Sequence, residues 1–165
     1  MLSKYGNITY PYWIDGAAEF IGKQRRKNNN ELYEEVPSKK RGEWDSSVHP
    51  LGVKGELIAA TYLDEKGISY NLSELLGSNP IVDADIIIND KRVDIKTIRP
   101  DGWDLLVTVS SHKNIDKNID SYFFIQILDE CNSRYWVFKH EEVSKWRKKM
   151  CRAYNYYKPI NEINL

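Results

Sequence analysis

The stretch Ile81–Thr97, IVDADIIINDKRVDIKT, decides the predicted fold, because it has the pattern of two short strands joined by a turn. Side chains alternate across a strand, so Asp83, Asp85 and Ile87 are expected to share one face. The other face is expected to hold Val82, Ala84, Ile86 and Ile88. Asn89 and Asp90 tolerate positive φ and therefore favour a two-residue hairpin turn between the strands.

The register that this turn imposes brings charged side chains together. Counting back from a two-residue turn, Asp85 lies directly opposite Asp94, and Asp83 lies opposite Lys96. Like charges in that arrangement destabilise a strand pair by up to about 1 kcal/mol, and a divalent cation such as Mg²⁺ would offset the repulsion. The same pattern also fits the solvated face of a two-stranded ribbon in which Asp83 pairs with Lys96.

The rest of the chain supplies further elements around this hairpin. Val53, Leu57, Ala60 and Leu63 recur at helical spacing, and Gly67 closes that helix. Helices are predicted over residues 53–67 and 140–154, and strands over residues 68–72, 105–109, 121–128 and 134–139. This order predicts an α/β or α+β fold, with a central mixed β-sheet flanked by helices.

The first fifty residues are the least regular part of the sequence. A helix is predicted to begin after Asp15, which can cap it, and to end where Asn28–Asn30 interrupt it. A polar segment follows over residues 31–50, with no sustained period, and is predicted to be a long loop or ordered arm. We expect one domain over residues 1–165, in which residues 1–50 form an N-terminal helix and arm.

Composition narrows the function classes. The chain has 165 residues, 41% hydrophobic and 29% charged, with no apolar run long enough to cross a membrane, no secretory signal and only two cysteines. We therefore expect a soluble protein of the reducing cytoplasm. The formal net charge is zero, so any nucleic-acid contact must come from local basic clusters, such as those at residues 23–27, 39–41 and 145–149. For each cluster taken singly, solvated surface is the favoured interpretation.

The hairpin and the helix before it resemble the signature of the PD-(D/E)xK nuclease superfamily, which has a restriction-endonuclease-like fold. VDADIII followed by RVDIKT is similar to that family's Asp on one strand and (D/E)-x-K triplet on the next. GVKGELIAATYL matches the preceding helix, with Glu56 at the position where the family often has a Glu. The catalytic core implied by the resemblance covers residues 52–128. The triplet begins with Asp94 instead of the commoner Glu, and no Pro directly precedes either Asp83 or Asp85.

The resemblance implies a metal-dependent endonuclease. Asp85 and Asp94 would bind Mg²⁺, with Mn²⁺ as a substitute, together with the backbone carbonyl of Ile95 and with Glu56 directly or through water. Lys96 would hold and activate the water that attacks the phosphodiester. Asp83 remains an alternative to Asp85 as the hairpin ligand, although the register favours Asp85.

DNA is the expected partner. The small size is more like that of phage-type or junction-resolving endonucleases, and because small nucleases of this kind commonly act as homodimers, a homodimer is expected. The alternative is a catalytically silent nuclease fold that binds nucleic acid or a protein, and a third possibility is an unrelated binding module. Secondary candidates are Gln126, which could face the site or be a satisfied polar group, and His112 with Lys113, which could meet a phosphate or lie in an ordinary loop. The histidines are too scattered along the chain to indicate a zinc site.

Overall fold

The computed structural model describes residues 3–33, 48–72 and 84–163, and in these ranges the chain forms an α+β protein with two sheets. The larger sheet has six strands in the spatial order β1 (Tyr5–Thr9), β7 (Asn132–Lys139), β6 (Ser121–Ile127), β4 (Lys91–Ile98), β3 (Ile86–Ile88) and β2 (Tyr70–Asn71). The smaller sheet has the order β5 (Asp104–Thr108), β9 (Tyr154–Pro159) and β8 (Arg147–Met150). The helices are α1 (Trp13–Tyr33), α2 (Val48–Glu65) and the short α3 (Val109–His112) and α4 (His140–Val143), with a 3₁₀ turn at Ile160–Glu162.

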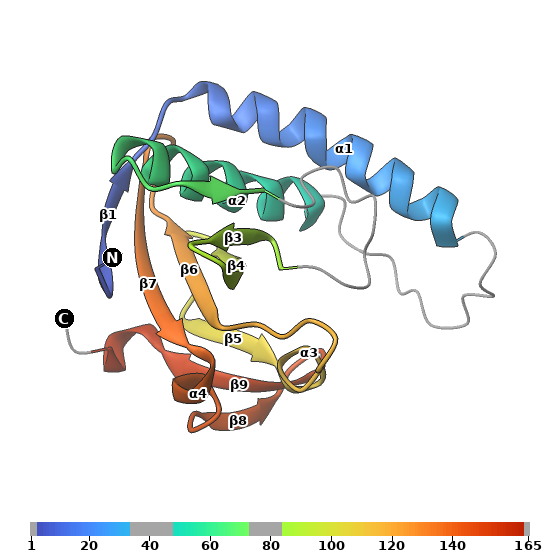
Figure 1. Ribbon diagram of the computed structural model, residues 1–165, viewed down its shortest axis with the longest axis vertical. Coiled ribbons are helices and arrows are strands. Elements are labelled where there is room, and N and C mark those ends of the chain that lie inside the picture. The colour runs from blue at the N-terminus through green and yellow to red at the C-terminus, as the bar shows by residue number, and fades with distance from the viewer. Residues whose placement is uncertain (1–2, 34–47, 73–83, 164–165) are drawn as a thin grey trace.

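The six-stranded sheet is mixed and curled, and its pairings are antiparallel except where β6 runs parallel to β4. Helices α1 and α2 lie on one side of it, and the three-stranded sheet lies on the other (Figure 1). The predicted α+β class is thus confirmed. The prediction of a single sheet flanked by helices is wrong on one side, where a second sheet takes the place of a helix.

Strand β6 shows why the six-stranded sheet has two buried faces. Its side chains alternate, so Phe123 and Ile125 point to one hydrophobic cluster, while Tyr122 and Phe124 point to another. We call the first side the helix face; its core includes Ile58, Tyr62 and Leu63 of α2 and Ile86, Ile88, Val93 and Ile95 of the hairpin. We call the second side the second-sheet face; its core includes Leu105, Val107, Trp136, Phe138, Val143 and Tyr156.

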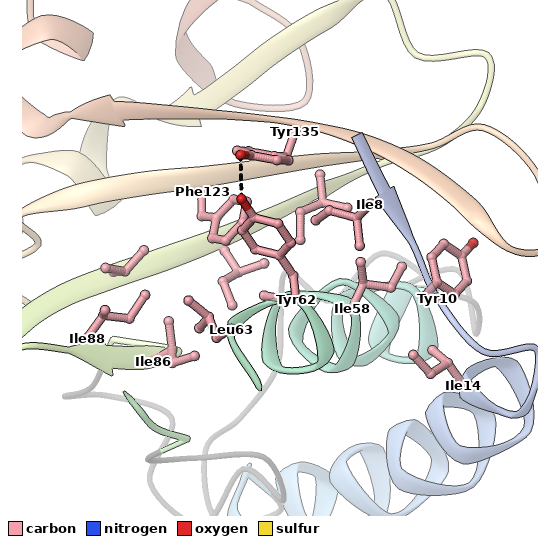
Figure 2. Close-up of a cluster of buried hydrophobic side chains, with 14 of the residues drawn as sticks. Ile8, Tyr10, Ile14, Ile58, Tyr62, Leu63, Ile86, Ile88, Phe123 and Tyr135 are labelled. Carbon is pink, nitrogen blue, oxygen red and sulfur yellow. Dashed lines mark hydrogen bonds between the residues drawn. The ribbon is translucent and has the colours of Figure 1, made fainter. Parts of the chain in front are cut away.

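Helix α2 packs on the helix face mainly through Ile58, Ala59, Tyr62 and Leu63, so of the four residues at the predicted helical spacing only Leu63 belongs to this core, and Leu57 packs against it. Val53 and Leu63 are fully buried, and Gly67 ends the helix with a φ of 62°, a conformation that glycine adopts without strain. Figure 2 shows Tyr62 reaching through this core to the hydroxyl of Tyr135 on β7, at an oxygen–oxygen distance of 2.7 Å. A buried hydroxyl pair of this kind satisfies two polar groups that would otherwise lose their hydrogen bonds to water.

The N-terminal region differs from its prediction in two ways. Helix α1 begins at Trp13, so Asp15 lies in its first turn and is not its N-cap, and the helix continues through Asn28–Asn30. Asn lowers helix propensity by only a fraction of a kcal/mol, so packing between α1 and α2 outweighs it. The close approach of the two helices is seen at Gly22, where an added Cβ would lie 2.6 Å from the backbone nitrogen of Pro50. The residues before α1 form β1, an edge strand that the sequence did not predict.

The C-terminal region is the largest departure from prediction. The helix expected over residues 140–154 is only α4, four residues long, after which the chain turns and forms β8 and then β9. Acidic residues at the start of residues 140–154 and basic residues near their end favour a helix through its dipole. In the structure, residues 147–150 instead pair with residues 154–157 of a Tyr-rich strand.

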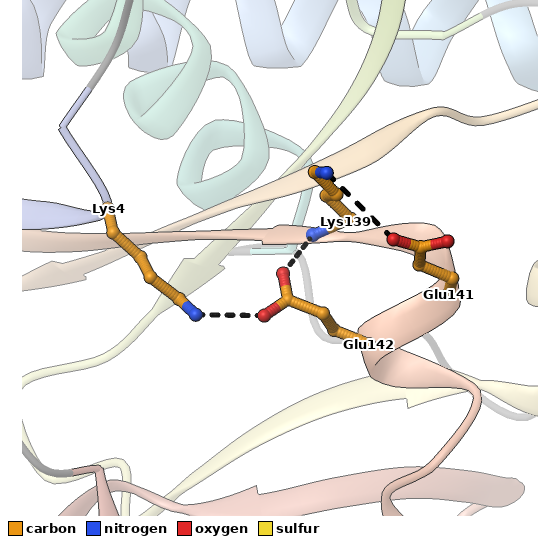
Figure 3. A network of polar contacts seen from close by, with 4 residues as sticks. All are labelled: Lys4, Lys139, Glu141 and Glu142. Carbon is orange, nitrogen blue, oxygen red and sulfur yellow. Dashed lines mark hydrogen bonds and ion pairs between the residues drawn. The ribbon is translucent and has the colours of Figure 1, made fainter.

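Glu142 helps to start α4 and also ties it to β1. Its carboxylate accepts a hydrogen bond from the backbone N–H of Lys139 at 2.9 Å and pairs with Lys4 at 2.8 Å (Figure 3). Trp146 then packs against Phe138 and Phe124 with ring centroids 5.0 and 5.7 Å apart, which closes the turn after α4 over the second-sheet face. The aromatic packing explains why the chain leaves the helix so soon.

Within the described ranges, no helix combines the length and the apolar character that crossing a bilayer would require.

Candidate active site

The hairpin formed by β3 and β4 has the predicted turn and register. Asn89 and Asp90 both have positive φ, 49° and 62°, as a two-residue turn of the primed type requires. Ile88 pairs with Lys91, and Ile86 pairs with Val93. One position beyond the last paired residues, the side chains of Asp85 and Asp94 contact each other, as the register predicts.

Asp85 lies where the regular pairing of β3 stops. The chain bends at this residue, and Ala84 belongs to the core of the second-sheet face, whereas Ile86 and Ile88 belong to that of the helix face. The expectation that Ala84 and Ile86 share one face is therefore wrong, because the bend interrupts the alternation. Asp85 uses its side chain in place of strand backbone: its Oδ2 accepts the backbone N–H of Ile95 at 2.6 Å.

The backbone carbonyl of Ile95 lies on the same edge of β4 as Asp85. Arg92 exchanges hydrogen bonds with Asp120 next to β6, through its carbonyl and through its N–H. Backbone groups of alternate residues point to opposite sides of a strand, so Asp94 and Lys96 direct theirs toward β6, and Ile95 directs its own toward β3. Because β3 begins only at Ile86, which pairs with Val93, none of its residues pairs with Ile95.

Asp85, which is half-buried, and Asp94, which is buried, form a carboxyl pair. Burial, followed by the negative charge of Asp94, raises the pKa of Asp85 well above its usual range. Burial acts in the same direction on Asp94, but the Lys96 charge and a hydrogen bond from Asp85 outweigh it and lower the pKa of Asp94. The two carboxyl groups are in hydrogen-bonding contact, and holding two acids together where water has little access has a cost that a cation would relieve.

Lys96 projects from β4 on the same side as Asp94. Its ammonium lies 2.6 Å from Asp94 Oδ2, and about a third of its side chain is exposed. Burial lowers the pKa of Lys96, but the charges of Asp94 and Asp85 more than compensate and raise it above its usual range. Lys96 therefore keeps its proton at neutral pH and acts as a hydrogen-bond donor and a positive charge.

Glu56 reaches the neighbourhood from α2. The position of the helix is fixed by Gly55, where an added Cβ would lie 1.9 Å from the hydroxyl oxygen of Thr97 on β4, so only glycine fits. Both carboxylate oxygens of Glu56 accept hydrogen bonds from Arg25 of α1, at 2.8 and 2.6 Å. Burial raises the pKa of Glu56, and the hydrogen bonds and charge of Arg25 oppose the rise.

The structure thus brings three of the predicted side chains together, Asp85, Asp94 and Lys96, and places the Ile95 carbonyl at the same edge. The charges of Asp94 and Lys96 affect the pKa of Glu56, so the three side chains are neighbours. Both carboxylate oxygens of Glu56, however, are hydrogen-bonded to Arg25. In the parts of the chain that the structure describes, no three His, Cys, Asp or Glu side chains form a group that could hold a metal ion by themselves. Asp83, the alternative ligand, lies outside the described residues.

Arg25 is the site residue that the sequence reasoning missed. It belongs to the basic cluster at residues 23–27, for which solvated surface was the favoured interpretation. A signal was present, because Arg25 follows Ala18 and Gly22 at helical spacing, and these small residues lie on the buried side of α1. Helical phase would have placed Arg25 on the packed face, unlike Arg26, which is exposed.

Two of the secondary candidates, Gln126 and His112, are buried and hydrogen-bonded within the protein. Gln126 donates hydrogen bonds to backbone carbonyls of the loop after β4, at 3.0 to 3.4 Å, and accepts one from Arg134 at 2.7 Å, so it is a satisfied polar group. His112 is buried, and its ring nitrogens bond to Tyr122 and Ser144, each at 2.9 Å. A ring engaged in this way is not placed to meet a phosphate, whereas Lys113 beside it is exposed.

Two histidines that are far apart in the sequence lie together in the fold. His112 and His140 stack with ring centroids 3.6 Å apart, and burial, helped by the neighbouring His140 and Lys113, lowers the pKa of His112 to about 4. Neither forms part of a metal-holding group in the described ranges.

No protein-family model matches the chain, and no curated protein is similar to it at a significant level. The chemistry of the site's own side chains therefore has to carry the functional argument.

Proposed function

We propose that this chain is a metal-dependent endonuclease of the PD-(D/E)xK type, which hydrolyses phosphodiester bonds in DNA. The observation that carries the proposal is the contact between the half-buried Asp85 and the buried Asp94, with the Lys96 ammonium 2.6 Å from Asp94. The order of elements also supports it, since a helix, three antiparallel strands and a returning parallel strand, α2, β2, β3, β4 and β6, fit the core expected from the resemblance.

The donor set suits Mg²⁺, or Mn²⁺ in its place. Two carboxylates and a carbonyl are hard oxygen ligands, and Mg²⁺ commonly binds through one or two carboxylates while it keeps several waters. Asp85, Asp94 and the Ile95 carbonyl would hold the ion, with Glu56 as a further ligand either directly or through water. When bound, the cation would neutralise negative charge that develops on the phosphate oxygens during in-line attack by water.

Lys96 has a role that follows from its ionisation. Because its pKa is raised, it is an ammonium at neutral pH and cannot take a proton from the attacking water. It would instead donate hydrogen bonds that orient the water and would stabilise charge on the phosphate as the bond from phosphorus to the leaving oxygen breaks. Asp94 fixes the Lys96 ammonium by direct contact.

Cleavage assays test the proposal. Purified protein with Mg²⁺ is incubated with plasmid, single-stranded and branched DNA, and product is measured for the wild type, Asp94→Asn and Lys96→Ala. We expect Asp94→Asn to reduce the rate by about 10³-fold, since several kcal/mol of transition-state stabilisation depend on the cation, and Lys96→Ala by about 10²- to 10³-fold.

Matched controls lie in the same hairpin. Asp90→Asn changes an exposed turn position with a φ of 62°, which Asn tolerates, and Lys91→Ala removes an exposed lysine from the same strand as Lys96. Both controls should cleave like the wild type. Full activity in Lys96→Ala would contradict the assignment, and wild-type protein that binds these DNAs without cleaving them would favour a catalytically silent nuclease fold. Size-exclusion chromatography with light scattering tests the accompanying expectation of a homodimer.

A further inference from the structure

Helix α1 reaches the candidate active site through Arg25. Its guanidinium meets Glu56 as a fork, with Nη1 at 2.8 Å from Oε1 and Nη2 at 2.6 Å from Oε2. Two parallel charge-assisted hydrogen bonds of this kind engage both oxygens of the carboxylate and fix its orientation.

The pair belongs to the interior. The side chains of Arg25 and Glu56 are 14% and 6% exposed, so water has little access to solvate either charge if the pair separates. The backbone on both sides is held in place, because Gly22 of α1 packs directly on Pro50 of α2, and Lys54 of α2 pairs with Asp15 of α1. Separating Arg25 from Glu56 would therefore require two packed helices to move or would leave a buried charge alone.

Glu56 is thus already supplied with a cation, unlike the two carboxylates of the hairpin. Asp85 and Asp94 contact each other, and Lys96 pairs with Asp94 through Oδ2 alone. A divalent ion that bound directly to Glu56 would lie within a few ångströms of the Arg25 guanidinium, where like charges repel strongly at low dielectric. The absence of a three-acid group among the described residues agrees with this division.

We infer that Arg25 withdraws Glu56 from the metal's direct ligands, so that the site holds one divalent cation, on Asp85, Asp94 and the Ile95 carbonyl. The inference rests on the proposed function and decides between the direct and indirect roles open to Glu56. Beside Glu56, the Arg25 guanidinium supplies the positive charge that a second cation would supply in a two-metal site. It is a positioning residue, because it acts on the site through Glu56.

Metal titration without DNA tests this inference apart from activity. Mn²⁺ binding is measured by isothermal calorimetry and by the loss of free-ion electron paramagnetic resonance signal, for the wild type, Glu56→Gln and Asp94→Asn. We expect one ion per chain in the wild type, an unchanged dissociation constant in Glu56→Gln, and an affinity loss of at least about 100-fold in Asp94→Asn, more than outer-sphere partners typically cause.

Arg25→Gln gives the converse result. With the fork removed, Glu56 becomes available, and we expect a second Mn²⁺ to bind per chain or the first to bind more tightly. Arg26→Gln is the matched control, because Arg26 is the exposed neighbour on the same helix, and its metal binding should equal that of the wild type. Removal of one partner of a buried ion pair destabilises the fold, so circular dichroism must show that Arg25→Gln is folded. If Arg25→Gln does not fold, Glu56→Gln still tests the inference.

Each other outcome has a definite meaning. Two ions in the wild type, or an affinity loss in Glu56→Gln equal to that in Asp94→Asn, would overturn the inference and leave the proposed nuclease in place. An unchanged metal stoichiometry and affinity in folded Arg25→Gln would also overturn it. Wild-type protein that binds no divalent ion would remove both the inference and the metal-dependent function.

Discussion

The two faces of the six-stranded sheet are covered in different ways, and the difference explains where the candidate site lies. On the helix face, aliphatic side chains of the hairpin pack under α2 along the length of β3 and β4. On the second-sheet face, aromatic rings of β6 and β7 pack against a small sheet, and this side of β4 carries Asp94 and Lys96. One strand can thus anchor a core with alternate residues and present charged groups with the others.

The largest expected effects come from neighbouring residues of β6 that serve opposite faces. Phe123 and Phe124 are both fully buried, so changing either to Ala should lower the free energy of unfolding by about 3–5 kcal/mol in urea titrations. Native-state hydrogen exchange should separate them: Phe123→Ala should speed exchange in α2, and Phe124→Ala should speed it in β5 and β9. Identical exchange patterns would show that the two faces form one cooperative unit.

The next effect concerns acid stability and belongs to the second-sheet face. The pKa of His112 is lowered from 6.5 to about 4, so the folded state binds its proton less readily than the unfolded state. The resulting stability is present above pH 6.5 and is lost as the pH falls through about 4, by an amount on the order of 3 kcal/mol. Urea unfolding at several pH values should show this loss in the wild type.

His112→Gln serves as the comparison, since a neutral amide can still bond to Tyr122 and Ser144 but does not titrate. The part of the acid-dependent loss that His112 causes should disappear in this variant. An unchanged pH dependence would mean that groups other than His112 govern the acid stability.

A smaller effect is expected at the contact between α2 and β4 on the helix face. Gly55→Ala introduces a Cβ 1.9 Å from the Thr97 hydroxyl, and overpacking of this kind costs about 1–3 kcal/mol. Gly52→Ala is the matched control in the same helix, because nothing lies within 4 Å of its added Cβ, and it should stabilise by up to about 1 kcal/mol. Thr97→Ala added to Gly55→Ala should restore much of the lost stability, and failure to do so would place the strain elsewhere.

The smallest effect is expected at the hydroxyl pair under α2. Tyr62→Phe removes one partner of the 2.7 Å contact with Tyr135 and should lower the free energy of unfolding by about 1 kcal/mol. Burial raises the pKa of Tyr135 to about 12, as expected for a hydroxyl that keeps its proton in this core. Tyr12→Phe, at a residue 80% exposed, should leave stability unchanged. A loss above about 3 kcal/mol in Tyr62→Phe would indicate that Tyr135 is left without a partner, although Ser3 also contacts it.

Prediction from sequence succeeded where the relevant forces are local. The turn at Asn89–Asp90 depends on two residues that tolerate positive φ, and it sets the register that places Asp85 beside Asp94. The apolar periodicity of α2 and the Gly67 end signal are equally local. In contrast, the chain from His140 onward carries charge signals typical of a helix, and only the pairing between β8 and β9 shows that it forms strands.

The sequence by itself determined the hairpin, the pairing of two acids across it and the lysine beside them, because turn chemistry and the two-residue period act over a few positions. Only the tertiary structure decided that a second sheet covers the other face, and that Arg25 reaches across to Glu56. The second sheet and the pair of Arg25 with Glu56 both depend on contacts between segments far apart in the chain. The local sequence of one segment does not indicate which other segment it contacts. The folded arrangement therefore assigns to Glu56 a partner that its place in a sequence motif did not indicate.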